Sequence, residues 1–528
     1  MKKYIPFLVL LLVLLIHLAI INDYGFTWDF HFHFFGGGKL LGIEPDQLEP
    51  RPLPFVEPDP RNAWTLPYGP LMSIPPVASY LLFYKTLRVL PADAAYHLPI
   101  ILWGVVGIAI LYTFMKEAFT ARVGIFAALF LALTPRYFGD LHNNMKDVPS
   151  AAIFTLNMWM LWRWVKYKRT IDLFLAVVAF AIAFNIKINS VFIPVVFATW
   201  IIVLQVNTAR GGVLFRRIVT PLSYFILAPF AAFLLWWFFW PDPIGQLKHA
   251  FLTFGVGTNN IEVILNGKWY CSGSTVPWYY PYWYFAITTP LPMLLLFFTG
   301  LFSKHKKSLL LLWIILPLLR YVIPTVGVID GVRHFEEVLF PIAALAALGA
   351  DMLFRFPKFA SLITLITLMS LTWNIVSYHP YQITYFNELV GGVKGAFGKY
   401  DLDYWGTSQK AAVEWINKEA PPNSKVNIIM GTAVAGQYLR PDLLTRLNRY
   451  THDESDFVVL LNRQSFLYRF FYAYEYLLTH TPTHTIEVQG TPLVWIFDNR
   501  TDNQTPRQTP WWQDEDPCII KYWRGERL

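Results

Sequence analysis

The stretch PRYFGDLHNNMKDVP (Pro135–Pro149) places acids, bases and amides together between two long apolar runs. Ionisable groups at membrane depth are costly and usually mark a site. A second dense cluster, WDFHFHF (Trp28–Phe34), follows the first apolar run of the chain. If both clusters lie on the same side of a membrane, we expect them to face one cavity. The polar members of the first cluster are Arg136, Asp140, His142, Asn143, Asn144, Lys146 and Asp147.

The composition of the chain is that of an integral membrane protein. Its 528 residues are 55% hydrophobic and only 15% charged, and the mean hydropathy is +0.39. A soluble domain carries about 25% charged residues. The net charge of +8 does not indicate nucleic-acid binding, because the Lys and Arg residues lie in short loops between apolar runs, where they set topology. Cys271 and Cys518 are too few for a disulfide framework or a metal–thiolate site, and whether they pair is open.

Eleven apolar runs have about the length of a membrane span. Lys2 and Lys3 precede the first run and no small-residue cleavage pattern follows it, so we expect an uncleaved span with a cytoplasmic N-terminus. With this start, every predicted cytoplasmic loop is basic. The predicted spans are 5–21, 97–115, 122–138, 150–165, 171–186, 189–206, 218–240, 283–302, 307–325, 335–353 and 359–378.

The apolar stretch 72–90 is not counted as a span. It contains two prolines and is split by Lys85 and Arg88, and counting it would move every later basic loop to the outer side. We therefore predict that it lies in the interface or re-enters the membrane. The segments then expected on the extracytoplasmic side are 22–96, 139–149, 241–282, 326–334 and the tail from His379.

The tail 379–528 is predicted to be a small α/β domain. Strand-like runs cover 426–431, 456–462 and 492–499, and a helical run covers about 407–419. The predicted fold class is thus a polytopic α-helical membrane protein of about 11 spans plus interfacial helices, covering residues 1–378 with outer loops 22–96 and 241–282. The extracytoplasmic α/β domain 379–528 follows it.

Asp29, His31 and His33 stand at alternate positions just after the first span. On a strand all three would share a face, whereas on a helix only Asp29 and His33 would. Asp29 is a candidate catalytic carboxylate, with the histidines orienting it or joining it in binding a divalent metal. His33 is also a candidate substrate ligand. An interfacial loop with aromatic anchors is the structural alternative.

Asp147 closes the first cluster. It precedes the span from Ser150, where an acid suits the helix dipole, and that position is compatible with a catalytic role. Among its neighbours, His142, Asn143 and Lys146 are candidate ligands of a substrate's hydroxyl or phosphate groups.

Basic residues near the outer ends of spans are candidate phosphate ligands. Lys187 interrupts AFNIKINSVF, and Arg333 and His334 precede the span that begins at 335. Arg320 is a weaker candidate inside WIILPLLRYVIP. Each could instead be a snorkelling anchor, but a converging set would grip an anionic headgroup.

These motifs resemble the polyprenyl-phosphate-dependent membrane glycosyltransferases of the GT-C type. This superfamily includes protein O-mannosyltransferases and the lipid A aminoarabinose transferase, with a bacterial subgroup that carries an outer C-terminal domain. The resemblance rests on Asp29 in the first outer loop, on TPRYFGDLHNNMKDVP with its closing Asp147, on Lys187, and on GVRHFEEVLFP at the head of a late span. The block YFNELVGGVKGAFGKYDLDYWG (385–406) resembles the bacterial subgroup.

The resemblance implies an inverting transfer of a hexosyl or pentosyl group from a polyprenyl-phosphate donor to a lipid, glycan or protein hydroxyl in the cell envelope. By position, Asp29 would be the general base, Asp147 would orient the acceptor or a metal, and Lys187 would contact the lipid phosphate. The expected setting is a bacterial inner membrane, with no nucleic-acid partner and a divalent metal as the open cofactor question.

Two other functions fit part of the pattern. A transporter or flippase of a lipid-linked anion would also carry intramembrane cations, but along a path through the membrane. A signalling or scaffold protein would leave the charged clusters without a role. The polar groups crowd the predicted outer mouth, so the transferase is preferred.

Overall fold

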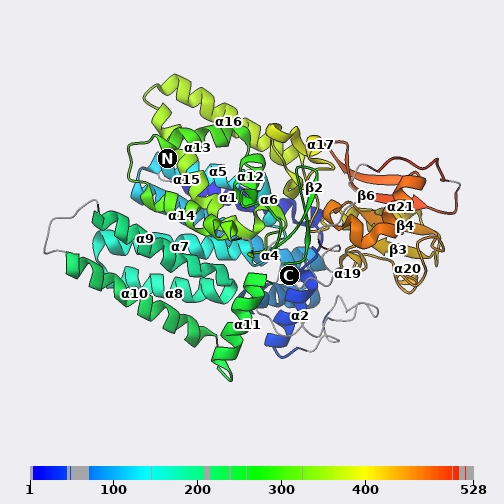
Figure 1. Ribbon diagram of the computed structural model, residues 1–528, viewed down its shortest axis with the longest axis horizontal. Helices are drawn as coiled ribbons and strands as arrows, with labels where there is room; N and C mark the ends of the chain where they lie inside the picture. The colour runs from blue at the N-terminus through cyan, green and yellow to red at the C-terminus, as the bar shows by residue number, and fades with distance from the viewer. Residues whose placement is uncertain are drawn as a thin grey trace.

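The computed structural model describes residues 4–43, 48, 70–143, 145–206, 214–236, 240–256, 259–323, 325–501, 503–510 and 518. A large helical unit carries the N-terminal part of the chain, and a smaller unit of strands and short helices extends from one side of it (Figure 1).

Helices form at the positions of the predicted spans. Where 283–302 was predicted as one span, two helices form instead, α12 (Tyr280–Thr288) and α13. They meet at 117° around Pro290, because a proline cannot continue the ladder of α12. The other long helices are α1 (Ile5–Ala19), α4 (Ala92–Ala118), α5 (Ala121–Ala132), α7 (Asp147–Tyr167), α8 (Thr170–Ile186), α9 (Phe192–Val206), α10 (Leu214–Leu235), α13 (Leu291–Leu301), α14 (Ser308–Leu319), α15 (Leu339–Leu353) and α16 (Pro357–Ser377).

Two described helices, α4 and α16, are long and apolar enough to cross a membrane, and the bent pair α12–α13 makes three if it counts as one span. Six further apolar helices are shorter. The protein is therefore a mostly helical membrane protein, and the predicted number of about 11 spans stays a prediction.

Glycines let α13 and α15 pack closely. A Cβ at Gly300 would lie 1.9 Å from the Leu345 carbonyl oxygen, and one at Gly349 would lie 2.0 Å from that of Leu296. Small residues at a helix crossing allow this approach in membrane proteins. Because α15 is buried along nearly its whole length, this crossing lies in the core of the helical unit.

Residues 70–86 form a series of short helical segments rather than one long helix. A 3-10 turn (Pro70–Ser73) leads into α3 (Ile74–Ser79), and a π-helical segment (Tyr80–Thr86) follows. They pack against α2 (Phe30–Leu40) and α4. The interfacial or re-entrant placement of 72–90 stays a prediction.

The C-terminal unit is built on a four-stranded mixed sheet of order β3-β4-β6-β5. β3 and β4 pair in parallel, and the other pairs are antiparallel. The three strands and the helix expected from the sequence are present. β5 was not predicted, because HTIEV alternates too weakly between apolar and polar residues. The strands are β3 (Val426–Ile429), β4 (Phe457–Leu461), β5 (His484–Val488) and β6 (Thr491–Asp498). The helices are α17 (Gly392–Ala396), α18 (Gln409–Glu419), α19 (Thr432–Ala435), α20 (Pro441–Leu444) and α21 (Phe471–Thr479).

Part of the 241–282 loop joins the C-terminal unit. After α11 (Pro243–Val256) the loop forms an antiparallel hairpin, β1 (Glu262–Leu265) and β2 (Lys268–Cys271). Its Asn266-Gly267 turn has positive φ at both residues, as a two-residue hairpin turn requires. Ile264 and Trp269 of the hairpin pack in the same apolar core as the central strand β4.

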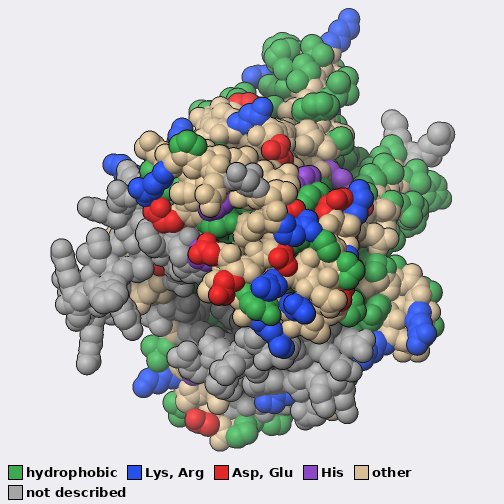
Figure 2. All heavy atoms as spheres, turned by 90° about the vertical axis from the view of Figure 1, so that its right-hand side faces the viewer, with side chains coloured by type: hydrophobic (Ala, Val, Ile, Leu, Met, Phe, Trp, Pro, Cys, Tyr) green, Lys and Arg blue, Asp and Glu red, His purple; other side chains and the backbone are tan. Residues whose placement is uncertain are grey.

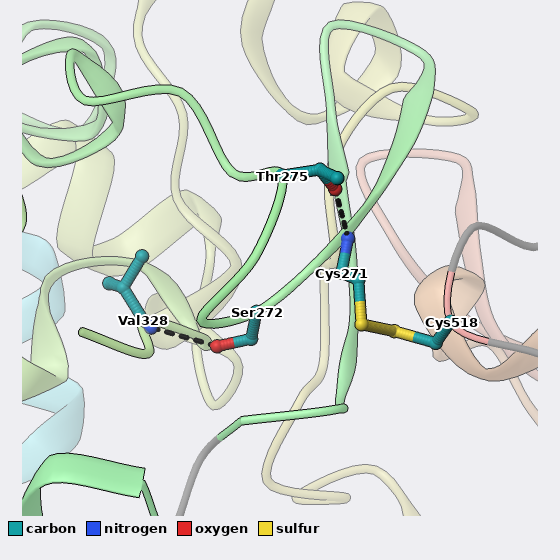
Figure 3. Close-up of a disulfide and its surroundings, with 5 residues drawn as sticks. All are labelled: Cys271, Ser272, Thr275, Val328 and Cys518. Atoms are coloured by element: carbon teal, nitrogen blue, oxygen red, sulfur yellow. Dashed lines mark hydrogen bonds between the residues drawn. A yellow bond between two sulfur atoms is a disulfide. The ribbon is translucent and has the colours of Figure 1, made fainter. Parts of the chain in front are cut away.

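The hairpin is also tied to the end of the chain. Cys271 forms a disulfide with Cys518, so the pairing that the sequence left open is present (Figure 3). Beside it, Thr275 accepts a hydrogen bond from the Cys271 amide and Ser272 accepts one from the Val328 amide (Figure 3). The segments before α12 and before α15 are thereby fixed next to the C-terminal unit.

Seen from the side of the C-terminal unit, the surface mixes acidic and basic side chains, while hydrophobic side chains gather toward the margins (Figure 2). The helices α1 and α16 carry many of the exposed large apolar residues. That distribution suits a helical unit in lipid and a C-terminal unit in water.

Candidate functional site

Asp29 lies at the N-terminal end of α2 and contacts two basic residues. Its Oδ2 is 3.1 Å from Nζ of Lys146 and 3.6 Å from Nη2 of Arg333. The Asp29 side chain keeps 25% of its exposure, whereas those of Lys146 and Arg333 keep 11% and 9%. The carboxylate is thus held by cations and still reachable.

Asp147 makes a second acid–base pair one residue beyond Lys146. It begins α7, and its Oδ1 lies 2.5 Å from Nζ of Lys187, which follows the last turn of α8. Both side chains are almost fully buried. Lys146 and Asp147 are therefore consecutive in the chain, and Lys146 contacts Asp29 whereas Asp147 contacts Lys187.

Arg333 links this arrangement to the segment before α15. Its Nη1 lies 3.4 Å from Oδ2 of Asp330, and its guanidinium lies 4.2 Å from the ring centroid of Trp405. Sequence patterns thus named Asp29, Lys146, Asp147, Lys187 and Arg333 separately, and the structure brings them together.

Opposing effects set the pKa of Asp29. The surrounding packing raises the pKa of this carboxyl, but the nearby positive charges of Lys146 and Arg333 outweigh it, so the pKa lies below its usual range. Asp29 is a carboxylate at neutral pH. It can accept a hydrogen bond, and then a proton, from a hydroxyl group that displaces one of its cations.

Two acids that received no role in the sequence analysis lie in the same region. Asp140 and Glu336 are buried, and no described residue hydrogen-bonds either of their carboxyl groups. Burial, and then the negative charge of Asp147, raise the pKa of Asp140 to about 8, against the lowering effect of Arg136. Asp140 was visible as part of the polar stretch, whereas Glu336 was hidden within the predicted span 335–353.

The predicted binding residues do not all face this acid–base cluster. His142 lies in a different contact set, with its Nε2 2.8 Å from Nδ1 of His17 and its ring stacked on Tyr24 at 3.8 Å. Asn143 donates to the Gly139 carbonyl, and its own carbonyl accepts from Thr27, two residues before Asp29. Nδ1 of His142 and Oδ1 of Asn143 have no hydrogen-bond partner among the described residues, so their role as substrate ligands stays a prediction.

His33 and His334 border the site. Nδ1 of His33 lies 3.5 Å from the Ser73 hydroxyl. The carbonyl of His334 accepts hydrogen bonds from Arg320 at 2.5 Å and from Asn189 at 3.0 Å. Arg320 thereby fixes the backbone next to Arg333.

The metal hypothesis gains no support from geometry. Within the described part of the chain, no group of three or more His, Cys, Asp or Glu side chains is placed to hold a metal ion. α2 is helical, so Asp29, His31 and His33 do not share one face as they would on a strand. A metal role for these three residues stays a hypothesis.

Residues 73–236 match the family model of the dolichyl-phosphate-mannose-protein mannosyltransferases. A search of curated protein sequences finds no match. Among solved structures, the fold matches ArnT from Cupriavidus metallidurans. The undecaprenyl-phosphate complex of ArnT has a TM-score of 0.51 at 12% identity, covering 96% of this chain and 100% of ArnT. Its apo state gives 0.53 at 12% identity, with 95% and 99% covered.

Residues 73–236 thus resemble this mannosyltransferase family, and the chain has the fold of ArnT. The oligosaccharyltransferase AglB from Archaeoglobus fulgidus also matches, with a TM-score of 0.42 at 12% identity over 87% of this chain and 70% of AglB. The family match begins in the turn before α3 and ends after α10, so it includes the polar stretch, Asp147 and Lys187.

Proposed function

We propose that this protein is a glycosyltransferase that moves a sugar from a polyprenyl-phosphate donor to an acceptor hydroxyl on the extracytoplasmic side of the membrane. The observation that carries the proposal is the acid–base cluster around Asp29. It combines a reachable carboxylate with buried cations, which are the two kinds of group that this reaction needs.

Lys187 and Arg333 are the proposed ligands of the donor phosphate. Each is buried and held by a carboxylate, Lys187 by Asp147 and Arg333 by Asp330. Both cations are already removed from water, so binding a phosphate adds no further cost of desolvating them. Arginine can also donate two parallel hydrogen bonds to the phosphate. ArnT, which shares the fold, binds undecaprenyl phosphate.

Asp29 is the proposed general base. The acceptor oxygen attacks the anomeric carbon, and its proton passes to the Asp29 carboxylate. The bond from the anomeric carbon to the phosphate oxygen breaks with its electron pair, and polyprenyl phosphate leaves with its charge stabilised by Lys187 and Arg333. A single displacement of this kind inverts the anomeric configuration.

The orientation rests on two features. Every loop predicted to be cytoplasmic is basic. The Cys271–Cys518 disulfide joins two segments predicted to be outside, where disulfides persist. We propose that 1–378 forms the transmembrane transferase domain and 379–528 an extracytoplasmic domain.

The test is a transfer assay with purified protein. The protein is incubated with a radiolabelled polyprenyl-phosphate sugar pool and with lipid and glycan fractions of the envelope. We expect label to enter an acceptor fraction as free polyprenyl phosphate appears, with an anomeric configuration opposite to that of the donor. Retention of configuration would exclude a single displacement, and the absence of transfer from every donor tested would contradict the proposal.

A further inference from the structure

Arg463 brings a charge from the C-terminal unit to the edge of the site. It follows β4, and its side chain keeps 6% exposure. Its Nη2 lies 2.8 Å from Oδ1 of Asp330, and its Nη1 donates to the Tyr404 carbonyl at 3.0 Å. Its guanidinium also lies 3.8 Å from the ring centroid of Phe466. These contacts fix the guanidinium on several sides.

Asp330 divides its two oxygens between two arginines. Oδ1 faces Arg463 at 2.8 Å and Oδ2 faces Arg333 at 3.4 Å. Arg333 in turn reaches Asp29 at 3.6 Å. The four side chains form an alternating chain of charges from the C-terminal unit to the candidate base, and the shorter contact of Asp330 is the one with Arg463.

The C-terminal unit also holds the backbone of the first loop. The amide of Trp28 donates to the Trp405 carbonyl at 2.8 Å, and the amide of Phe26 donates to the Tyr438 hydroxyl at 2.7 Å. The Arg463 guanidinium lies 5.3 Å from the Trp28 ring centroid. The segment that ends in Asp29 is thus fixed from the same side as the ion chain.

We propose that Arg463 is a positioning residue that sets how Arg333 is shared between Asp330 and an anion in the site. Arg463 and Arg333 compete for one carboxylate. As long as Arg463 satisfies Asp330, Arg333 is free to turn toward Asp29 and a bound phosphate. The C-terminal unit therefore tunes donor binding without touching the donor. This inference rests on the phosphate-binding role of Arg333 in the proposed function.

The charge chain predicts effects of opposite sign for substitutions of Arg463 and of Asp330. In Arg463→Gln, Asp330 keeps only Arg333 and holds it more tightly, so phosphate binding weakens. In Asp330→Asn, Arg333 loses that competitor and phosphate binding strengthens. Asn suits the backbone at this position, because Asp330 has a positive φ of 55° and Asn tolerates that conformation. The double variant should bind like Asp330→Asn, because Arg463 acts only through Asp330.

The test is a titration of the full-length protein in detergent with undecaprenyl phosphate, with the unphosphorylated alcohol as the reference ligand. We expect Arg463→Gln to bind the phosphate roughly three- to tenfold more weakly, as is typical of residues that act through an intermediate. Asp330→Asn should bind it more tightly, and Arg463→Lys should be close to wild type. Arg500→Gln removes the exposed partner of an ion pair with the buried Asp498 in the same unit, and it is the matched control.

The outcomes separate this inference from the proposed function. Equal affinities in all variants, or weaker binding in both single variants, would overturn the inference, since a merely structural role weakens both. So would a wild type that does not prefer the phosphorylated lipid. Opposite shifts in a protein that transfers no sugar would sustain the inference and contradict the transferase reaction. The thermal unfolding midpoint and the intact disulfide establish that each variant is folded.

Discussion

Nζ of Lys187, just after the end of α8, lies 2.5 Å from Oδ1 of Asp147, the first residue of α7, and both side chains are buried. A buried cation that is paired with a carboxylate can exchange that partner for a phosphate. This relationship makes Lys187 the most direct test of donor binding.

Lys187→Ala should weaken the binding of a polyprenyl-phosphate sugar by roughly 30-fold or more, because loss of one partner of a desolvated charge pair costs about 2–5 kcal/mol. Arg333→Ala should act in the same direction. The measurement is a titration with the phosphorylated lipid and with its alcohol. Lys166→Ala, at an exposed position at the other end of α7, is the control. Normal affinity in both site variants would show that Lys187 and Arg333 do not bind the phosphate and are only interfacial anchors.

Lys146→Met should change the pH dependence of transfer. The positive charge of Lys146 helps to keep the pKa of Asp29 low, whereas the surrounding packing raises it. Without the lysine the pKa of Asp29 rises, because a nearby positive charge no longer favours the carboxylate. Because the reaction needs the carboxylate, transfer should then fail at a higher pH as the solution is acidified. The profile of kcat/KM against pH measures this shift.

The control for that profile is Lys39→Met, which removes an exposed charge from the same helix, α2. Its acid limb should coincide with that of wild type. An unshifted limb in Lys146→Met would mean that Asp29 is not the group whose ionisation limits transfer.

Gly300→Ala should destabilise the helical unit. The new methyl group would meet the Leu345 carbonyl oxygen at 1.9 Å, so α13 and α15 must separate. Overpacking of this kind costs about 1–3 kcal/mol or more. The thermal unfolding midpoint in detergent should fall clearly below that of Leu295→Ala, a truncation on the exposed side of α13. Equal midpoints would show that the crossing can relax.

The membrane orientation can be tested through the disulfide. After mild reduction of intact cells, a membrane-impermeant thiol reagent should label both Cys271 and Cys518, since both are expected outside. Labelling before reduction should be absent. Protection of Cys518 in intact cells but not in lysed cells would place the C-terminal domain in the cytoplasm and invert the proposed topology.

Much of the fold could be predicted because apolar runs of span length have few other uses. The predicted runs became helices, and the strand patterns 426–431, 456–462 and 492–499 became β3, β4 and β6. Pro290 signals the break in the run 283–302, but the prediction of a single span did not include it. The hairpin β1–β2 was also signalled, by Asn266-Gly267 between strand-like residues, but nothing local shows that it packs in the C-terminal core.

The sequence indicated individual residues of the site, but it did not indicate which of them contact one another. Asp29 and Lys146 are separated by 117 positions, and Arg463 and Asp330 by 133, so only the packing of the helices reveals these contacts. Composition marked the polar stretch as unusual because charges are costly near lipid. It could not separate His142, which packs on Tyr24, from Lys146, which meets Asp29. Arg463 gave no signal, because a single arginine after a strand is ordinary.

The central claim is that Asp29 takes the proton of the acceptor, and a comparison of Asp29→Asn with Asp23→Asn tests it most directly. Asp23 lies in the same first loop and pairs with His379 at 2.9 Å on the exposed side. In a transfer assay at saturating donor, Asp23→Asn should match wild type. Asp29→Asn should still bind the donor lipid but transfer roughly 10²–10⁴-fold more slowly, as expected for loss of a general base. Full transfer activity in purified, folded Asp29→Asn would contradict the account.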